Sequence, residues 1–169
     1  MKYKINENIR LVKAQIKDLR EITNFQDNII NNMERKDFFT PLTKEEIVYP
    51  LENNGVVYML FDKKIMIGLL ILTINPPEEI IEEYKLYDNT DVAILDSIMI
   101  DKNYRGFGLQ CQGMKIIYND AKKLNVKKIV ATVHPENIYS SRNFDILGYK
   151  VINEITIHGG KRLIYCIEV

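Results

Sequence analysis

Residues 92 to 110 read VAILDSIMIDKNYRGFGLQ, the pattern of a strand, a glycine turn and the start of a helix. Val92 to Ile100 is almost wholly apolar and rich in isoleucine, which predicts a buried strand. Gly106 and Gly108 follow in the turn, where glycine allows close approach of the backbone. The first N–H groups of a helix lack partners, and Arg105 adds a charged donor. This stretch therefore predicts a site for an anion such as phosphate.

Two nucleotide-binding motifs use a similar turn, and neither fits this spacing. A P-loop needs lysine and then serine or threonine after the last glycine, whereas Leu109 and Gln110 stand there. A dinucleotide fingerprint needs a third small residue where Cys111 stands. It also needs an acidic residue at the end of the next strand, which instead finishes at His134. The anion site is thus of another kind.

The segments on either side of this stretch alternate between strand and helix patterns. Seven runs are expected as strands: Ile9–Lys13, Val56–Phe61, Lys64–Thr73, Val92–Ile100, Lys128–Val133, Tyr149–Ile157 and Arg162–Glu168. Five are expected as helices: Leu19–Met33, one that begins at Thr43, Glu78–Leu86, Met114–Leu124 and Glu136–Leu147. This order predicts a mixed α/β (α+β) fold with a central sheet of about seven strands and flanking helices.

Three local signals refine this reading. Thr43 and Glu46 have the spacing of a capping box, and Pro50 should shorten or bend the helix that follows. Gly68, inside an apolar strand, indicates a β-bulge. Because no repeat or linker interrupts the pattern, we expect residues 1–169 to form a single domain.

Composition narrows the class of protein. Lysine plus arginine equal aspartate plus glutamate at 23 each, so the net charge does not suggest a nucleic-acid partner. Cys111 and Cys166 form no metal-binding or disulfide pattern, and we expect no metal. No apolar run approaches the roughly 20 residues that a membrane span needs, and the first residues lack a signal-peptide core. We therefore expect a soluble cytoplasmic protein that uses neither nucleic acid nor membrane.

The strand and glycine turn resemble motif A of the GCN5-related N-acetyltransferases (GNAT). In that family Arg or Gln, two residues, Gly, one residue and Gly or Ala form the pyrophosphate loop, and Arg105 and Gly108 match it. Gly106 follows the common Arg-Gly form, while Gln110 stands where the family has a small residue. Residues 134 to 149, HPENIYSSRNFDILGY, resemble motif B, in which an Asn opens a helix that ends in Leu-Gly-aromatic. The resemblance covers essentially the whole chain.

This resemblance implies a cosubstrate, acetyl-coenzyme A, and a place for it. The fourth and fifth strands, Val92–Ile100 and Lys128–Val133, would splay apart within a mostly antiparallel, GNAT-like sheet. The pantetheine arm would lie between them, paired with the backbone, and a backbone donor would stabilise the developing oxyanion. The residues implied to bind the cosubstrate are Ile98, Met99, Ile100, Arg105, Gly106, Phe107, Gly108, Leu109, Gln110 and Asn137.

The resemblance also implies direct attack by an amine on the thioester, for which a group must take the proton. Asp96 is the candidate general base, because it matches an acidic position often used on this strand and apolar neighbours should disfavour its ionised form. The alternative is that Asp96 only bonds the backbone or faces water. Water or Ser97 would protonate the thiolate. His134 is a further candidate base, but we favour the explanation that it caps the strand end before Pro135.

Two positions qualify this mechanism. Phe144 stands where many family members have a tyrosine general acid, so that donor is missing. Cys111 begins a helix, where the dipole would lower a thiol pKa, but packing explains it better because direct transfer needs no protein nucleophile. His158 reads as a turn residue.

The expected function is N-acetyltransferase activity from acetyl-CoA to a primary amine of a small molecule, peptide or protein. A non-catalytic acyl-CoA sensor or interaction module is the alternative, and a generic phosphate-binding domain is the third. Acceptor pockets in this family come from variable segments, here Asn24–Asn54 and Pro76–Asp91, so the acceptor stays open. Exposed strand edges near the C-terminus leave a homodimer open as well.

Overall fold

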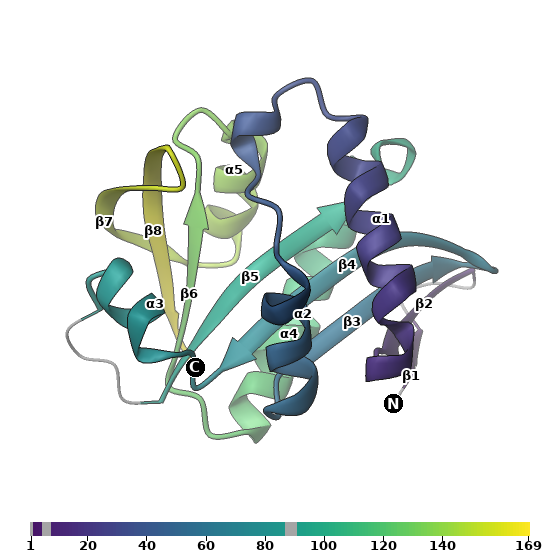
Figure 1. The fold of residues 1–169 in the computed structure, drawn as a ribbon, viewed down its shortest axis with the longest axis horizontal. Coiled ribbons are helices and arrows are strands. Elements are labelled where there is room, and N and C mark those ends of the chain that lie inside the picture. Colours follow the sequence, from purple (N-terminus) through teal and green to yellow (C-terminus); the bar gives the residue numbers. More distant parts are fainter. Residues whose placement is uncertain (1, 5–7, 87–90) are drawn as a thin grey trace.

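One twisted sheet runs through the molecule, with helices on both of its faces (Figure 1). The structure is a computed structural model and describes residues 2–4, 8–86 and 91–169. The eight strands lie in the order β1-β2-β3-β4-β5-β6-β8-β7. They are β1 (Lys2–Lys4), β2 (Ile9–Lys13), β3 (Val56–Asp62), β4 (Ile65–Ile74), β5 (Val92–Ile100), β6 (Lys128–Val133), β7 (Lys150–Ile157) and β8 (Gly160–Glu168). Every pair of neighbours is antiparallel except β5 and β6.

The predicted fold class is confirmed, and each of the seven expected strands is present. The eighth strand, β1, lies at the edge beside β2 and was not predicted. Its sequence, Lys-Tyr-Lys, is too short to show an alternating pattern and resembles a charged tail. A short, lysine-containing strand of this kind is a common way to end a sheet.

Five α-helices occupy the expected places. They are α1 (Leu19–Asn31), α2 (Lys44–Glu52), α3 (Glu78–Glu83), α4 (Leu109–Lys123) and α5 (Ile138–Ile146), with short 3-10 turns at Ile16–Asp18, Lys36–Phe38 and Lys102–Tyr104. The predicted capping box is confirmed, because the Thr43 hydroxyl accepts the Glu46 N–H and the Glu46 carboxylate accepts the Thr43 N–H. Pro50 lies inside α2, which continues only to Glu52. No described helix has the length and apolar character needed to cross a membrane.

The helices cover the sheet in two layers. On one face, α4 packs Met114 and Ile117 against strand residues such as Leu70 and Leu95. On the other face, α1 and α2 contribute Ile22, Phe25 and Ile47 to a cluster with Ile71 and Met99. A third cluster joins α3 to β6 and to the β7–β8 hairpin. The two faces therefore have separate apolar cores on either side of β4 and β5.

Two strands that begin as parallel neighbours then separate. Strands β5 and β6 pair only from Val92 opposite Lys128 to Ile94 opposite Val130. Beyond that point β5 stays with β4 as far as Ile100, and β6 stays with β8 as far as Val133. The predicted splay is thus confirmed. Residues Ile98 to Ile100 therefore have β4 on one side and, on the other, the opening that forms where β5 and β6 separate.

Gly55, between α2 and β3, has no room for a side chain. A Cβ added there would lie 2.4 Å from Pro50 Cβ and 2.6 Å from both Pro50 Cα and its carbonyl oxygen. Gly55→Ala should therefore destabilise the protein by about 1–3 kcal/mol, as overpacking does elsewhere. Thermal unfolding checks this, with a melting temperature lower by roughly 2–4 °C per kcal/mol.

The control for Gly55 is the adjacent Asn54, which has a φ of +60°. Asn54→Gly adds no atoms and places glycine in a region that glycine adopts readily, so the melting temperature should change little. If both variants lowered the melting temperature equally, the loss would come from changing the turn rather than from the contact with Pro50.

Candidate functional site

A bulge in β5 points Asp96 away from the regular ladder. Leu95 pairs with Leu72 and Ser97 pairs with Ile71, which leaves Asp96 without a partner on β4. Bulges of this kind bend a strand and re-aim a side chain, and they are frequent beside active sites. A second irregularity, where Leu60 pairs with Gly68 and Phe61 with Met66, lies next to the predicted bulge at Gly68. The bulge at Asp96 was not predicted.

Asp96 is half-buried in an environment that favours its protonated form. The pKa of Asp96 is raised from 3.8 to about 7, chiefly by burial. The nearby Glu46 carboxylate also acts to raise this pKa, whereas a hydrogen bond from the Thr73 hydroxyl acts to lower it. Thr73 lies on β4, beside the bulge. A carboxyl group with a pKa near neutrality can take up and release a proton under physiological conditions.

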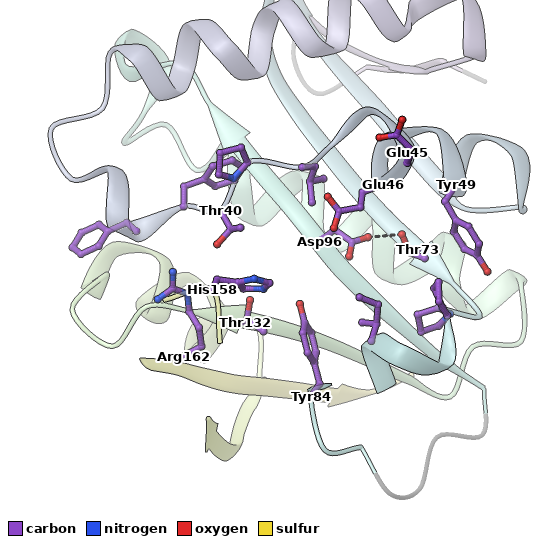
Figure 2. A pocket seen from close by; sticks show the side chains of 17 residues that line it. Thr40, Glu45, Glu46, Tyr49, Thr73, Tyr84, Asp96, Thr132, His158 and Arg162 are labelled. Carbon is purple, nitrogen blue, oxygen red and sulfur yellow. Dashed lines mark hydrogen bonds between the residues drawn. The ribbon is translucent and has the colours of Figure 1, made fainter. Parts of the chain in front are cut away.

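Asp96 opens into a pocket of about 300 Å³ (Figure 2). Segments far apart in the sequence form its walls: the connection between α1 and α2, the helices α2 and α3, the ends of β4 and β6, and the turn between β7 and β8. The lining residues with polar side chains are Thr40, Glu45, Glu46, Tyr49, Thr73, Tyr84, Asp96, Thr132, His158 and Arg162. Apolar lining comes from phenylalanine, proline, leucine and isoleucine side chains.

Several of these lining residues were missed from the sequence. Tyr84 lies beneath the pocket in Figure 2, and burial together with the negative charge of Asp96 raises its phenol pKa. His158, read as a turn residue, is in the turn between β7 and β8 but also reaches the pocket wall. Glu46 was recognised only as part of a capping box, and Arg162 only as the start of a strand. No local pattern distinguishes these side chains, since the fold alone brings them together.

The glycine turn lies between the end of β5 and the start of α4. Gly106 and Gly108 have φ angles of +83° and +72°, the left-handed region that favours glycine. Arg105 donates from Nε to the Ile100 carbonyl at 3.0 Å, which folds its guanidinium back over the strand end. Phe107 is 71% exposed at the tip of the turn. The turn therefore presents the start of α4 to solvent in the arrangement expected for an anion site.

Side chains of the two motifs contact each other across α4 and α5. Asn143 on α5 donates to the Gln110 side chain at 2.8 Å and accepts from the Cys111 thiol at 3.3 Å. Gln110, the departure from the family pattern, thus holds the turn to α5. Burial raises the pKa of the half-buried Cys111 thiol, opposite to the shift that a helix dipole would cause. Asn137 caps α5 by accepting the Ser140 N–H at 3.2 Å.

The other candidate residues occupy different surroundings. Ser97 is buried, and its hydroxyl has no hydrogen-bond partner among the residues that the structure describes. His134 is not among the residues that line the pocket. Its Nδ1 accepts the Glu136 N–H at 3.2 Å, its ring lies against Phe38, and its Nε2 is 3.7 Å from an Asp37 carboxylate oxygen. The arrangement of His134 fits a cap at the end of β6.

Phe144 lies inside the core. It is 3% exposed, stacks on Tyr165 at 5.1 Å and meets the edge of Tyr149 at 4.9 Å. It offers no proton donor, and the tyrosines that line the pocket are Tyr49 and Tyr84. Tyr84 belongs to the apolar cluster on the opposite face of the sheet from Phe144. Within residues 2–4, 8–86 and 91–169, no three histidine, cysteine, aspartate or glutamate residues are grouped as metal ligands.

Comparisons with known proteins agree on one family. The sequence model of the acetyltransferase (GNAT) family matches residues 18–149. An acetyltransferase of that family from Streptococcus pneumoniae has a similar structure, with a TM-score of 0.75, 16% identity, and coverage of 95% of this chain and 99% of that chain. An N-acetyltransferase from Staphylococcus aureus is similar at a TM-score of 0.73 and 18% identity. The match covers 96% of this chain and 99% of that chain.

A third structure carries a cofactor. It is an acetyltransferase from Salmonella typhimurium with its cofactor acetyl-CoA, similar at a TM-score of 0.71 and 12% identity, with 96% of this chain and 94% of that chain covered. No curated protein sequence matches the chain. At these identities the structures show a shared fold, while the family match spans both the glycine turn and the helix behind Asn137.

Proposed function

Because the chain belongs to the acetyltransferase (GNAT) family, we propose that it moves the acetyl group of acetyl-CoA to a primary amine by direct attack. We further propose that residues 1–169 form one acyl-CoA N-acyltransferase domain. The observation that carries this proposal is the position of Asp96, which a bulge turns into a pocket close to the point where β5 and β6 separate. An amine in the pocket and a thioester in the opening would then meet beside a carboxylate.

The residues around the opening fit acetyl-CoA. Backbone groups of Ile98, Met99 and Ile100, which do not pair with β6, would pair with the pantetheine arm as another strand would. The Ile100 carbonyl accepts from Arg105 Nε in this structure. Residues Arg105 to Gln110 would hold the pyrophosphate at the start of α4, where N–H groups are free, and Asn137 would order the neighbouring wall. The bound cosubstrate would supply an activated acetyl group. The Salmonella typhimurium acetyltransferase of similar fold was solved with acetyl-CoA, which supports this assignment.

Asp96 would act as the general base. An ammonium group has no lone pair, so its proton must leave before the nitrogen can attack. A carboxylate with a pKa near 7 is ionised in a large share of molecules at neutral pH and basic enough to accept that proton. Ser97 or water would donate a proton to the leaving thiolate, which leaves readily because a thiol pKa is about 8.5. His134 is the weaker candidate base, since it lies outside the pocket lining.

A screen for thiol release tests the proposed function. Purified protein would be given acetyl-CoA and amines, amino acids, polyamines, aminoglycosides and peptides, with free coenzyme A followed over time. Release that depends on an amine supports the transferase. Acetyl-CoA binding without release across the whole panel would instead support a non-catalytic acyl-CoA sensor, and absence of binding would refute both.

The glycine turn supplies a prediction on cosubstrate affinity. Gly106→Ala should weaken coenzyme A binding about tenfold, because a residue with a β-carbon at a φ of +83° costs roughly 1–2 kcal/mol and the turn will shift to relieve it. Isothermal titration calorimetry measures the change. No other atom lies within 4 Å of the added Cβ, so the effect comes from the backbone rather than from a clash.

Gly148→Ala is the matched control. Gly148 has a φ of +87° and equal free space, but it follows α5 and lies outside the turn. The control should lose similar stability while keeping its affinity for coenzyme A. Equal affinity losses in the two variants would contradict the placement of the pyrophosphate at Gly106.

A further inference from the structure

Arg162 is a buried charge in the wall of the pocket. It lies near the start of β8, is 5% exposed and lines the same pocket as Asp96. One terminal nitrogen donates to the Lys161 carbonyl at 2.9 Å and the other to the Asp37 carbonyl at 3.0 Å. A guanidinium group has five N–H donors. These two carbonyl contacts therefore leave donor capacity toward the pocket.

No carboxylate pairs with Arg162 among the residues that the structure describes. The Asp37 carboxylate attracts it, but Arg35 already binds that carboxylate at 2.7 Å in an exposed ion pair. Burial lowers the pKa of Arg162, which reflects the cost of removing its charge from water. A buried cation in a cavity is stabilised when an anion enters and forms charge-assisted hydrogen bonds with it.

The charges of the pocket are divided between two sides. Figure 2 shows Arg162 and His158 on one side of the pocket, with Thr40 and Thr132 near them, and Asp96, Glu46 and Thr73 on the other side. His158 can add a ring N–H donor next to the guanidinium. The carboxylates suit a cationic amine, while the guanidinium suits an anion. One molecule that carries both groups would satisfy both sides at once.

We propose that the acceptor is a small molecule with an anionic group, a carboxylate or a phosphate, that binds Arg162 while its primary amine lies at Asp96. This inference rests on the proposed function and names its substrate class. Strand β6 lies between β5 and β8, and paired strands are about 4.8 Å apart. Because β5 and β6 no longer pair beyond Ile94 and Val130, the backbones of Asp96 and Arg162 are separated by at least roughly 10 Å. The amine and the anion should therefore be several bonds apart, as in an ω-amino acid, rather than on adjacent atoms.

A different role for Arg162 makes a different prediction. Through the Asp37 carbonyl it also holds the Lys36–Phe38 turn over the pocket. If that were its whole role, its loss would slow transfer to every acceptor alike. If Arg162 recognises an anion, its removal should instead slow transfer to anionic acceptors more than transfer to neutral ones.

Matched acceptors distinguish these roles. Each pair consists of an anionic acceptor and a neutral one: 6-aminohexanoate with hexylamine tests for a carboxylate, and 4-aminobutyl phosphate with butylamine tests for a phosphate. In the wild type, the ratio of kcat/KM for the anionic acceptor to that for the neutral one should be at least about ten in one of the two pairs. Arg162→Gln should bring the preferred ratio close to one, because the rate with the anionic acceptor should fall further than the rate with the neutral amine. Arg162→Lys should restore part of the ratio. A ratio that Arg162→Gln leaves unchanged, or a wild type that prefers the neutral amines, overturns the proposal.

A binding measurement covers the case in which Arg162→Gln does not fold. Hexanoate or butyl phosphate, which lack an amine, should raise the melting temperature of the wild type in a saturable way, whereas hexanol should not. An equal response to hexanol and to both anions would overturn the proposal. Because this measurement needs no turnover, it also separates failure of anion recognition from failure of the transferase assignment, in which no amine would release coenzyme A.

Discussion

Replacing Asp96 with asparagine is expected to lower kcat for acetyl transfer by about 10²–10³-fold while coenzyme A binding is retained. General-base catalysis contributes an effect of this size, and asparagine keeps the shape of the side chain without its basicity. Asp96 lines the proposed acceptor pocket, whereas the proposed pyrophosphate contacts come from the turn at Arg105 to Gln110. Thiol-release kinetics and calorimetric titration of coenzyme A measure the two quantities separately.

The pH dependence supplies a second readout of the same group. With its pKa raised to about 7, Asp96 should be protonated below that pH, so wild-type kcat/KM should fall about tenfold per pH unit there. The D96N variant should lose this dependence. An unchanged acid limb in the variant would assign the titration to another group.

As pH rises toward 7, the stability that Asp96 contributes should fall while the catalytic rate rises. A folded-state pKa raised above the unfolded value means that the protonated carboxyl contributes stability at low pH, which is lost as pH rises from about 4 through about 7. Asparagine carries no such charge, so the stability of D96N relative to wild type should grow over that range. A D96N variant that is as stable as wild type or more so would exclude unfolding as the cause of its lost activity.

Asp27→Asn is the control for D96N. Asp27 is exposed on α1, so the same chemical change there should leave kcat, the pH profile and the melting temperature close to wild type. If D96N retained a rate within threefold of wild type, Asp96 would not be the base, and the pocket would have to use water or another side chain.

Phe144→Ala is expected to lower the free energy of unfolding by about 3–5 kcal/mol, the usual loss for a large aromatic side chain in a core. Phe144 is buried between Tyr149 and Tyr165, so its removal leaves a cavity between α5 and the sheet. Because α5 also carries Asn143, which holds Gln110, coenzyme A affinity should fall as well. Urea denaturation followed by circular dichroism measures the stability, and calorimetry measures the affinity.

Tyr139→Ala on the same helix is the matched control. The Tyr139 side chain is 80% exposed, so its removal should change the free energy of unfolding by no more than about 0.5 kcal/mol. Similar losses in the two variants would indicate that α5 is destabilised through helix propensity. A stable Phe144→Ala protein would show that the core collapses around the cavity.

Local patterns in the sequence were enough to place the strands, the helices and the glycine turn between β5 and α4. Apolar runs placed seven strands, and helical spacing placed five helices, because both periods are set by the backbone within one segment. The capping box at Thr43 and Glu46 also depends on residues three apart. The edge strand β1 was missed because three residues are too few to show a period.

The lining of the pocket beside Asp96 could not be predicted from such patterns. Glu46, Tyr84, His158 and Arg162 come from four separate segments, and each had a local explanation as a cap, a helix residue, a turn or a strand start. Arg162 becomes informative only when burial and the lack of a carboxylate partner are known. Both depend on what the rest of the chain places around it.

By itself the sequence determined the order of strands and helices, the glycine turn before α4 and the identity of Asp96 as a candidate base. The tertiary structure decided that Asp96 stands in a bulge, since a bulge exists only relative to the register of the neighbouring strand. It also decided which charges share one pocket, because desolvation and charge proximity act across space between segments that are distant along the chain.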